Sequence, residues 1–110
     1  MHNGLLYISG QLPVNGATGK IAEGGVREQT RQALANMDRV LTEFGTDRTK
    51  VLQCRVYTPD VALWDDINAV YAEYFGDHKP ARTIVPTSGL HYGSLIEIEA
   101  LAVCEEGDKA

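Results

Sequence analysis

The sequence predicts an α+β protein in which two helices pack on one face of a β-sheet. Two segments have apolar residues at intervals of three and four, which is typical of helices with one buried face, and a glycine follows each segment. Short β-prone segments precede, separate and follow these helices. The expected order is β-β-α-β-α-β-β. A chain of 110 residues has room for one hydrophobic core, so we expect a single domain over residues 1–110.

Two strands are expected before the first helix. Residues 5–9, LLYIS, are β-prone and lie between two glycines, which predicts the first strand. Residues 11–25, QLPVNGATGKIAEGG, are rich in turn-forming residues and predict a hairpin region. Its turn is expected at one of two dipeptides, Asn15-Gly16 or Thr18-Gly19.

The first helix is expected between Gly25 and Phe44. Gly45 follows this segment and suits the end of a helix. The apolar residues that would form its buried stripe are Val26, Ala33, Leu34, Met37, Val40, Leu41 and Phe44. Their spacing places them on one side of the helix, facing the sheet.

The second half of the chain predicts a strand, a helix and a final hairpin. Residues 51–58, VLQCRVYT, alternate between an apolar and a more polar face, as a half-buried strand does. Asp60 is a good N-cap for a helix that runs to Phe75. Residues 81–87, ARTIVPT, and 94–103, SLIEIEALAV, are β-rich and are connected by GLHYG. We expect them to form an antiparallel hairpin.

Because both helices cover one face of the sheet, its other face needs a separate explanation. The residues expected there are Gln53, Arg55, Tyr57, Leu95, Glu97, Glu99, Leu101 and Val103. This mixture is too apolar for a plain solvated face and too charged for a monomer core, which favours a subunit interface. Glu99 is expected either to pair with Arg55 across strands or to take part in function, and the same alternatives hold for Glu97.

Composition argues against several classes of partner. A formal charge of −5 offers no basic stripe for phosphates, so nucleic acid is not expected as a partner. The sequence shows neither a signal-peptide pattern nor a membrane-length apolar segment, so we expect a cytoplasmic protein without membrane association. Cys54 and Cys104 are expected as free thiols. The three histidines, which lie in separate segments, predict no metal site.

Four segments of the chain follow one another in a characteristic order, LYISGQLPVNGATGKI, REQTRQALANMDRVL, INAVYAEYFGDHKPARTIV and LIEIEALA. In order and spacing they resemble the RidA/YjgF (reactive intermediate deaminase, endoribonuclease L-PSP-like) family. The most specific part is Pro80-Ala81-Arg82, followed after a loop by Ile96-Glu97-Ile98-Glu99-Ala100. The resemblance implies a chorismate-mutase-like fold assembled as a homotrimer, with sheets facing the threefold axis and clefts between subunits. It also implies cofactor-independent hydrolysis of 2-imino acids to 2-oxo acids and ammonia.

The resemblance also assigns roles to individual residues. It implies that Arg82 binds the substrate carboxylate, with the backbone of Ile84 facing the ligand, and that Glu97 positions water as a catalytic residue. Asn68 and the Ser9-Gly10 pair match further substrate-binding positions; read without the family, Asn68 would be a helix-surface or capping residue and Ser9-Gly10 a strand end. Arg82 alone would be a surface ion-pair partner or a functional cation.

Three departures from the family pattern affect the expected activity. The sequence as given has no counterpart to a Gly-Pro-Tyr segment whose tyrosine lines the cleft, so we expect a more open site. Ile84 stands where a cysteine is common, and Leu90-His91-Tyr92-Gly93 replaces the usual loop. Two alternatives therefore stay open, a non-catalytic trimeric module that binds small carboxylates such as 2-oxo acids, and a ribonuclease, against which the acidic charge argues.

The expected chemistry has a spatial requirement. The planar guanidinium of an arginine suits a carboxylate, and one carboxyl group can handle both the attacking water and the proton for the departing nitrogen. A hairpin centred near His91 would place Arg82 opposite roughly residue 100, ~10 Å along the strand from Glu97. The two side chains would then meet through a ligand and a water, or across a subunit boundary.

Overall fold

The computed structural model describes residues 1–104. Its helices and strands are β1 Leu5–Gln11, α1 Val26–Glu43, β2 Val51–Thr58, α2 Trp64–Phe75, β3 Ala81–Pro86 and β4 Glu97–Val103. Three short 3₁₀ turns lie between them, η1 Arg48–Lys50, η2 Val61–Leu63 and η3 His91–Gly93. The two helices and four strands confirm the α+β class.

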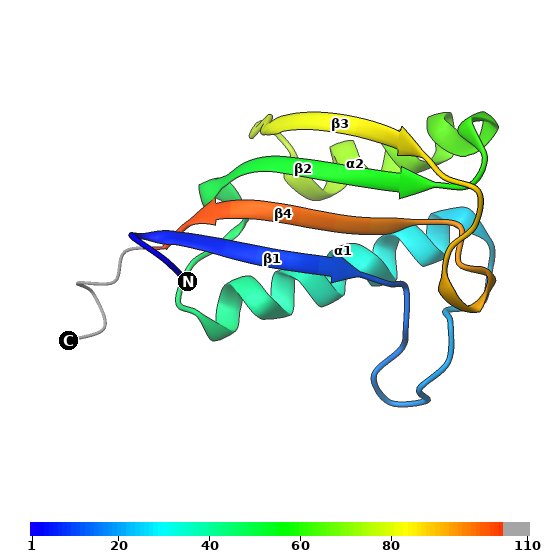
Figure 1. Ribbon diagram of the computed structural model, residues 1–110, viewed down its shortest axis with the longest axis horizontal. Coiled ribbons are helices and arrows are strands. Elements are labelled where there is room, and N and C mark those ends of the chain that lie inside the picture. Colours follow the sequence, from blue (N-terminus) through cyan, green and yellow to red (C-terminus); the bar gives the residue numbers. More distant parts are fainter. Residues whose placement is uncertain (105–110) are drawn as a thin grey trace.

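The strands form one mixed sheet in the order β1-β4-β2-β3. β4 is antiparallel to both of its neighbours, whereas β2 and β3 are parallel. Figure 1 shows that α1 and α2 lie on the same side of this sheet and leave its other face uncovered. That layering agrees with the expected arrangement of two helices on one face.

The predicted hairpin of the last two strands is wrong. β3 and β4 are not neighbours, because β2 lies between them. A parallel partner requires a crossover connection, and α2 supplies one between β2 and β3, so this part of the chain is a β-α-β unit. The loop after β3 then carries the chain past β2, and β4 enters the sheet between β1 and β2 (Figure 1).

The predicted second strand in residues 11–25 is also wrong. This segment forms only an isolated bridge between Val14 and Ile21. The carbonyls of Leu12 and Val14 accept hydrogen bonds from the Asn36 side chain on α1, at 2.9 and 3.0 Å. The segment is therefore tied to the helix instead of to the sheet. The turn does begin at Asn15, whose side chain accepts from the backbone N–H groups of two following residues.

The core lies between the helices and the inward face of the sheet. The alternation expected for the strand at residues 51–58 is present at Cys54 and Val56, which are fully buried while their sequence neighbours are not. Leu52 was expected on the same buried face and is a correction, because the strand register shifts between Val51 and Gln53 and leaves Leu52 46% exposed. β4 alternates in the same way, with Ile98 and Ala102 buried. Leu34, Met37 and Leu41 of α1 complete the layer, and each such side chain stabilises the fold by about 1.5–3 kcal/mol.

Asp60 caps the turn that leads into the second helix. Its carboxylate accepts a hydrogen bond from the Ala62 N–H at 2.9 Å, as an N-cap does. The capped turn is η2, and α2 itself begins four residues later, at Trp64. The helix is held against α1 by the Tyr74 hydroxyl, which donates to Asp38 at 2.6 Å.

The uncovered face of the sheet, here called the open face, carries most of the expected residues. Those that the structure places on it are Gln53, Arg55, Tyr57, Glu97, Glu99, Leu101 and Val103, and the structure adds Tyr7, which pairs with Leu101. Leu95 was wrongly expected on the open face, because it precedes β4 and packs against the margin of the core. Its N–H donates to Gln29 and its carbonyl accepts from Thr58, which fixes it at the end of the helix layer.

Cys54 gives a prediction for alkaline pH. Burial raises the pKa of its thiol to about 11. An unfolded thiol ionises near pH ~8.5, so the folded state holds the proton more tightly. The resulting stabilisation of the folded state is fully present below the pKa of the unfolded thiol, and it is lost as pH rises through about 11. We expect wild type to lose on the order of 2 kcal/mol more unfolding free energy between pH 8 and 11 than Cys54→Ala, as measured by urea titration. Equal losses in the two proteins would contradict this.

Candidate functional site

Arg82 lies on β3, the edge strand, and reaches toward α2. It is in register with Cys54, whose side chain faces the helices, so Arg82 is on the helix side of the sheet. Its Nη1 donates to the Asn68 Oδ1 at 2.9 Å. Its Cζ lies 4.5 Å from the centroid of the Trp64 ring and 4.8 Å from that of Tyr71. The structure thus brings together two predicted site residues, Arg82 and Asn68.

The guanidinium of Arg82 retains free hydrogen-bonding capacity. Arginine has five N–H donors, and Asn68 accepts from one of them. The three ion pairs among residues 1–104 involve Arg27, Arg31 and Arg55 and leave Arg82 without a carboxylate. Arg82 is exposed and, with Asn68, lines a hollow of about 410 Å³ beside the end of α2. An anionic ligand could enter this hollow and meet the guanidinium.

Glu97 lies on the other face of the sheet, over Gly10. In β4 it is in register with Tyr57 on the open face. A Cβ atom added at Gly10 would lie 1.9 Å from the Glu97 Oε2, so the carboxylate occupies the space of the missing side chain. A glycine at residue 10 is therefore a steric requirement of this arrangement. The structure brings Ser9-Gly10 and Glu97 together, as a second group of predicted site residues.

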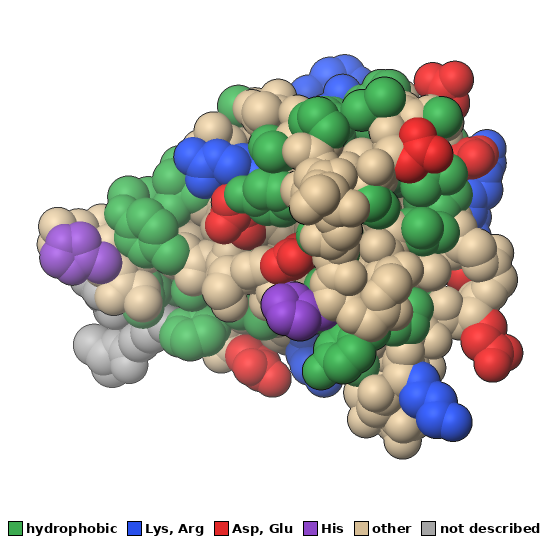
Figure 2. Space-filling view, turned by 45° about the vertical axis from the view of Figure 1, so that its right-hand side comes forward, with side chains coloured by type: hydrophobic (Ala, Val, Ile, Leu, Met, Phe, Trp, Pro, Cys, Tyr) green, Lys and Arg blue, Asp and Glu red, His purple; other side chains and the backbone are tan. Residues whose placement is uncertain are grey.

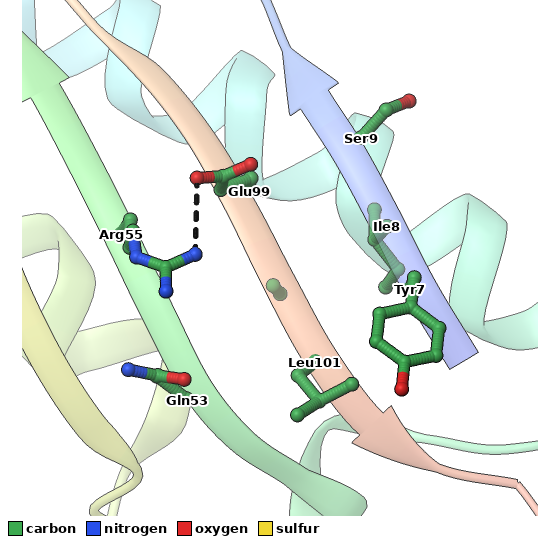
Figure 3. A pocket seen from close by; sticks show the side chains of 8 residues that line it. Tyr7, Ile8, Ser9, Gln53, Arg55, Glu99 and Leu101 are labelled. Carbon is green, nitrogen blue, oxygen red and sulfur yellow. Dashed lines mark hydrogen bonds and ion pairs between the residues drawn. The ribbon is translucent and has the colours of Figure 1, made fainter. Parts of the chain in front are cut away.

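Glu99 belongs to a hydrogen-bonded network on the open face. Its Oε1 lies 3.4 Å from the Arg55 Nη1, which confirms the expected cross-strand pair. The Tyr57 hydroxyl donates to the same oxygen, and this hydrogen bond raises the pKa of the phenol. Figure 3 shows Arg55 and Glu99 beside Ser9 and Tyr7, around a hollow of about 290 Å³. Glu99 is thus occupied by partners within the chain.

The two groups of predicted residues do not meet within one chain. Arg82 is in register with Cys54 on β2, and Cys54 is in register with Ala100 on β4. Ala100 is therefore aligned with Arg82 along the strand direction, as expected, but it lies two strands away. Glu97 lies three residues further along β4 and on the opposite face of the sheet. A site that uses both side chains would need them from two different copies of the chain.

Ile84 also lies on the edge strand. It is in register with the buried Val56, and its side chain packs against the core. Its predicted contribution, a backbone contact with ligand, depends on the free edge of β3 and not on its side chain.

Trp64 and Tyr71 are the two neighbours of Arg82 that sequence reasoning missed. With Asn68 they occupy positions i, i+4 and i+7 of α2, which share one helix face. That spacing was visible in the sequence, but the position of Arg82 beside this face depends on the parallel pairing of β2 and β3. Burial raises the pKa of the Tyr71 phenol, so its ring remains neutral at physiological pH.

No group of three potential metal ligands occurs among residues 1–104. Over the same residues, neither helix combines the length and apolar character that a membrane crossing requires. Both cysteines are free and buried.

These features define a small α+β protein built from a mixed four-stranded sheet and two helices on one face. A family model described as endoribonuclease L-PSP matches residues 1–104, and the chain belongs to this family, also called RidA/YjgF.

Individual relatives extend the comparison. The chain is 44% identical over 100 residues to a RutC family protein of Pyrococcus horikoshii, covering 91% of this chain and 79% of that protein. It is 39% identical over 98 residues to the human 2-iminobutanoate/2-iminopropanoate deaminase, covering 89% and 72%. It superposes with a TM-score of 0.89 and 30% identity on Escherichia coli TdcF with bound serine, covering 96% and 84%.

Proposed function

We propose that this protein hydrolyses reactive 2-imino acids, and the enamines in equilibrium with them, to 2-oxo acids and ammonia without a cofactor. The observation that carries the proposal is the exposed guanidinium of Arg82, which is held by Asn68 and two aromatic rings with donors to spare. The name of the human relative supports this reaction, and the bound serine of TdcF supports a ligand with a carboxylate.

Arg82 binds the substrate carboxylate in this proposal. A planar guanidinium can donate two parallel charge-assisted hydrogen bonds to a carboxylate, which fixes both the position and the orientation of the substrate. Asn68 orients the guanidinium, and the backbone of Ile84 at the sheet edge contacts the ligand. Holding the C=N carbon near a water molecule accounts for part of the rate enhancement.

Glu97 handles the water. Its carboxylate accepts a proton as the water oxygen bonds to the imine carbon, and it returns a proton to the nitrogen. The hydroxyl proton of the resulting carbinolamine then passes through the Glu97 carboxylate to the amino nitrogen as the C–N bond breaks, which forms the ketone and releases ammonia. Ser9 and Gly10 line this part of the site, with Gly10 leaving room for the Glu97 carboxylate.

The complete site lies between two copies of the chain in a homotrimer. The opposite faces occupied by Arg82 and Glu97 support this arrangement. The open face offers an interface with apolar side chains, among them Leu101 and Tyr7, and Tyr7 is 60% exposed. Small carboxylates would bind in the resulting clefts.

Two measurements test the proposal. An imine generated in the assay by an amino-acid oxidase should disappear faster in the presence of the protein, with the 2-oxo acid and ammonia formed in equal amounts. Light scattering should give three times the mass of the 12.0 kDa chain. Unchanged imine decay would exclude the deaminase, and a monomer at micromolar concentration would exclude the inter-subunit site.

A carboxylate-binding module without turnover is the second candidate. Arg82 would still capture 2-oxo acids, and Ile84, where the family often has cysteine, favours this alternative if the thiol contributes to turnover. Binding of 2-oxobutanoate without imine hydrolysis would select it. A ribonuclease is disfavoured by the net charge of −5, and Figure 2 shows basic and acidic side chains scattered among hydrophobic ones.

Gly10→Ala tests the placement of Glu97. The new Cβ would lie 1.9 Å from the Glu97 Oε2, so the carboxylate must move. We expect the imine turnover number to fall roughly tenfold or more, because small misplacements of catalytic groups have large effects. Gly16→Ala is the matched control, since its Cβ would come no closer than 3.5 Å to another side chain. Full activity in a folded Gly10→Ala protein would contradict the role of Glu97.

A further inference from the structure

Arg82 differs from the other arginines of the chain in how it is held. Arg27, Arg31 and Arg55 each pair with a carboxylate. Arg48 lies over one ring, that of Tyr74, at 5.1 Å, and its Nη1 also donates to the Tyr74 carbonyl. Arg82 instead lies over two rings, those of Trp64 and Tyr71.

Helix α2 provides the hydrogen bond and the two ring contacts that restrain this guanidinium. Trp64 and Tyr71 are separated by two turns of the helix, and Asn68 lies between them on the same face. The two rings attract the cation through their faces, while Asn68 accepts a hydrogen bond from its edge. Stacking leaves the N–H groups available, whereas a carboxylate partner would consume them.

We propose that Trp64 and Tyr71 are positioning residues that hold the Arg82 guanidinium in the orientation that a carboxylate ligand requires. An unrestrained arginine side chain loses rotamer entropy when a ligand immobilises it. The aromatic rings restrict the rotamers of Arg82 before the ligand arrives. Ligand binding therefore loses less entropy and is tighter. This inference rests on the proposed role of Arg82 but not on turnover.

Tyr71 is the fixed member of the pair and Trp64 the adjustable one. Tyr71 is 4% exposed and packs against Phe75, with ring centroids 4.8 Å apart, so its ring has little freedom. Trp64 is half-buried at the first position of the helix, next to solvent. Trp64 is therefore the residue to substitute, because it packs at the margin of the core and is not one of its buried members. As the only tryptophan, it also reports events at Arg82 by fluorescence.

The experiment compares Trp64→Leu with Trp64→Phe. Leucine keeps apolar volume but has no aromatic face, whereas phenylalanine retains one. For Trp64→Leu we expect the dissociation constant for 2-oxobutanoate, from calorimetry, to rise roughly 5- to 10-fold. The KM for the imine should rise by a similar factor, with kcat within about twofold. Trp64→Phe should recover most of the affinity. In the wild type, titration with 2-oxobutanoate should change the Trp64 fluorescence.

The outcomes separate this inference from the proposed function. If wild type binds the acid and Trp64→Leu binds it equally well, or if leucine and phenylalanine have equal effects, the positioning role is wrong and Arg82 can still be the carboxylate ligand. If wild type binds the acid with the expected Trp64 dependence but hydrolyses no imine, the positioning role stands and the deaminase fails. If wild type neither binds the acid nor hydrolyses the imine, both are wrong.

Discussion

Arg82→Ala is expected to abolish imine turnover and to weaken 2-oxobutanoate binding by about 100-fold or more. The substitution removes two charge-assisted hydrogen bonds to the ligand carboxylate, each of which contributes about 1.5–3 kcal/mol. The fold should persist, because Arg82 is exposed on an edge strand and forms no ion pair within residues 1–104. Calorimetric titration and the imine assay measure the two effects, and thermal unfolding verifies the fold.

Two further variants sharpen this test. Arg82→Lys keeps the charge but cannot make the planar two-bond contact, so it should recover only part of the affinity. Arg31→Ala is the matched control, because it removes an exposed arginine that pairs with Glu28 within α1 and not with a residue of α2. It should bind the acid as wild type does. Undiminished binding and turnover in Arg82→Ala would rule out the proposed role of this residue.

The elements of this fold were largely predictable because their signals are local. Residues 51–58 form a strand with the expected bounds, and α1 begins and ends within a residue of the expected helix. The alternation of buried and exposed residues also predicted most of the open face, with corrections at Leu95 and Leu52. Local periodicity determines such features, except where the strand register shifts, as it does between Val51 and Gln53.

The pairing of the last two strands was predicted wrongly, because their proximity in sequence is only one of the factors that determine which strands pair. The strand-helix-strand order of residues 51–86 is itself the pattern of a parallel crossover, and it outweighs the short loop between β3 and β4. The same error concealed the environment of Arg82. Only the parallel register with Cys54 places its side chain on the helix side, next to Trp64.

The spatial arrangement of the predicted site residues was not predictable from the sequence. Arg82 and Asn68 are in contact, and Glu97 lies over Gly10, so these residues form two separate groups. Their separation onto opposite faces of the sheet depends on register across three strands, which no single segment encodes. This separation can be tested by experiment. If the two residues of one site come from two chains, a chain that lacks Arg82 and a chain that lacks Glu97 can together form an intact site.

Mixing Arg82→Ala chains with Glu97→Gln chains is therefore expected to restore activity. Each variant alone should be nearly inactive, since Glu97→Gln removes the group that handles the water and should lower kcat roughly 100-fold or more. If every site takes Arg82 from one chain and Glu97 from its neighbour, random assembly at equal amounts makes about a quarter of the sites intact in a closed ring. The mixed oligomer should thus show about a quarter of the wild-type activity.

The mixed oligomers are prepared by co-expression with two different tags, and the imine assay is run on the purified product. The control combines wild type with chains that carry both substitutions, which measures how a defective neighbour affects an intact chain. If Arg82 and Glu97 of the same chain formed the site, each chain would carry one defect and no site could be intact. Activity no higher than that of the two separate variants would therefore reject the inter-subunit site, even if Arg82 and Glu97 were each essential.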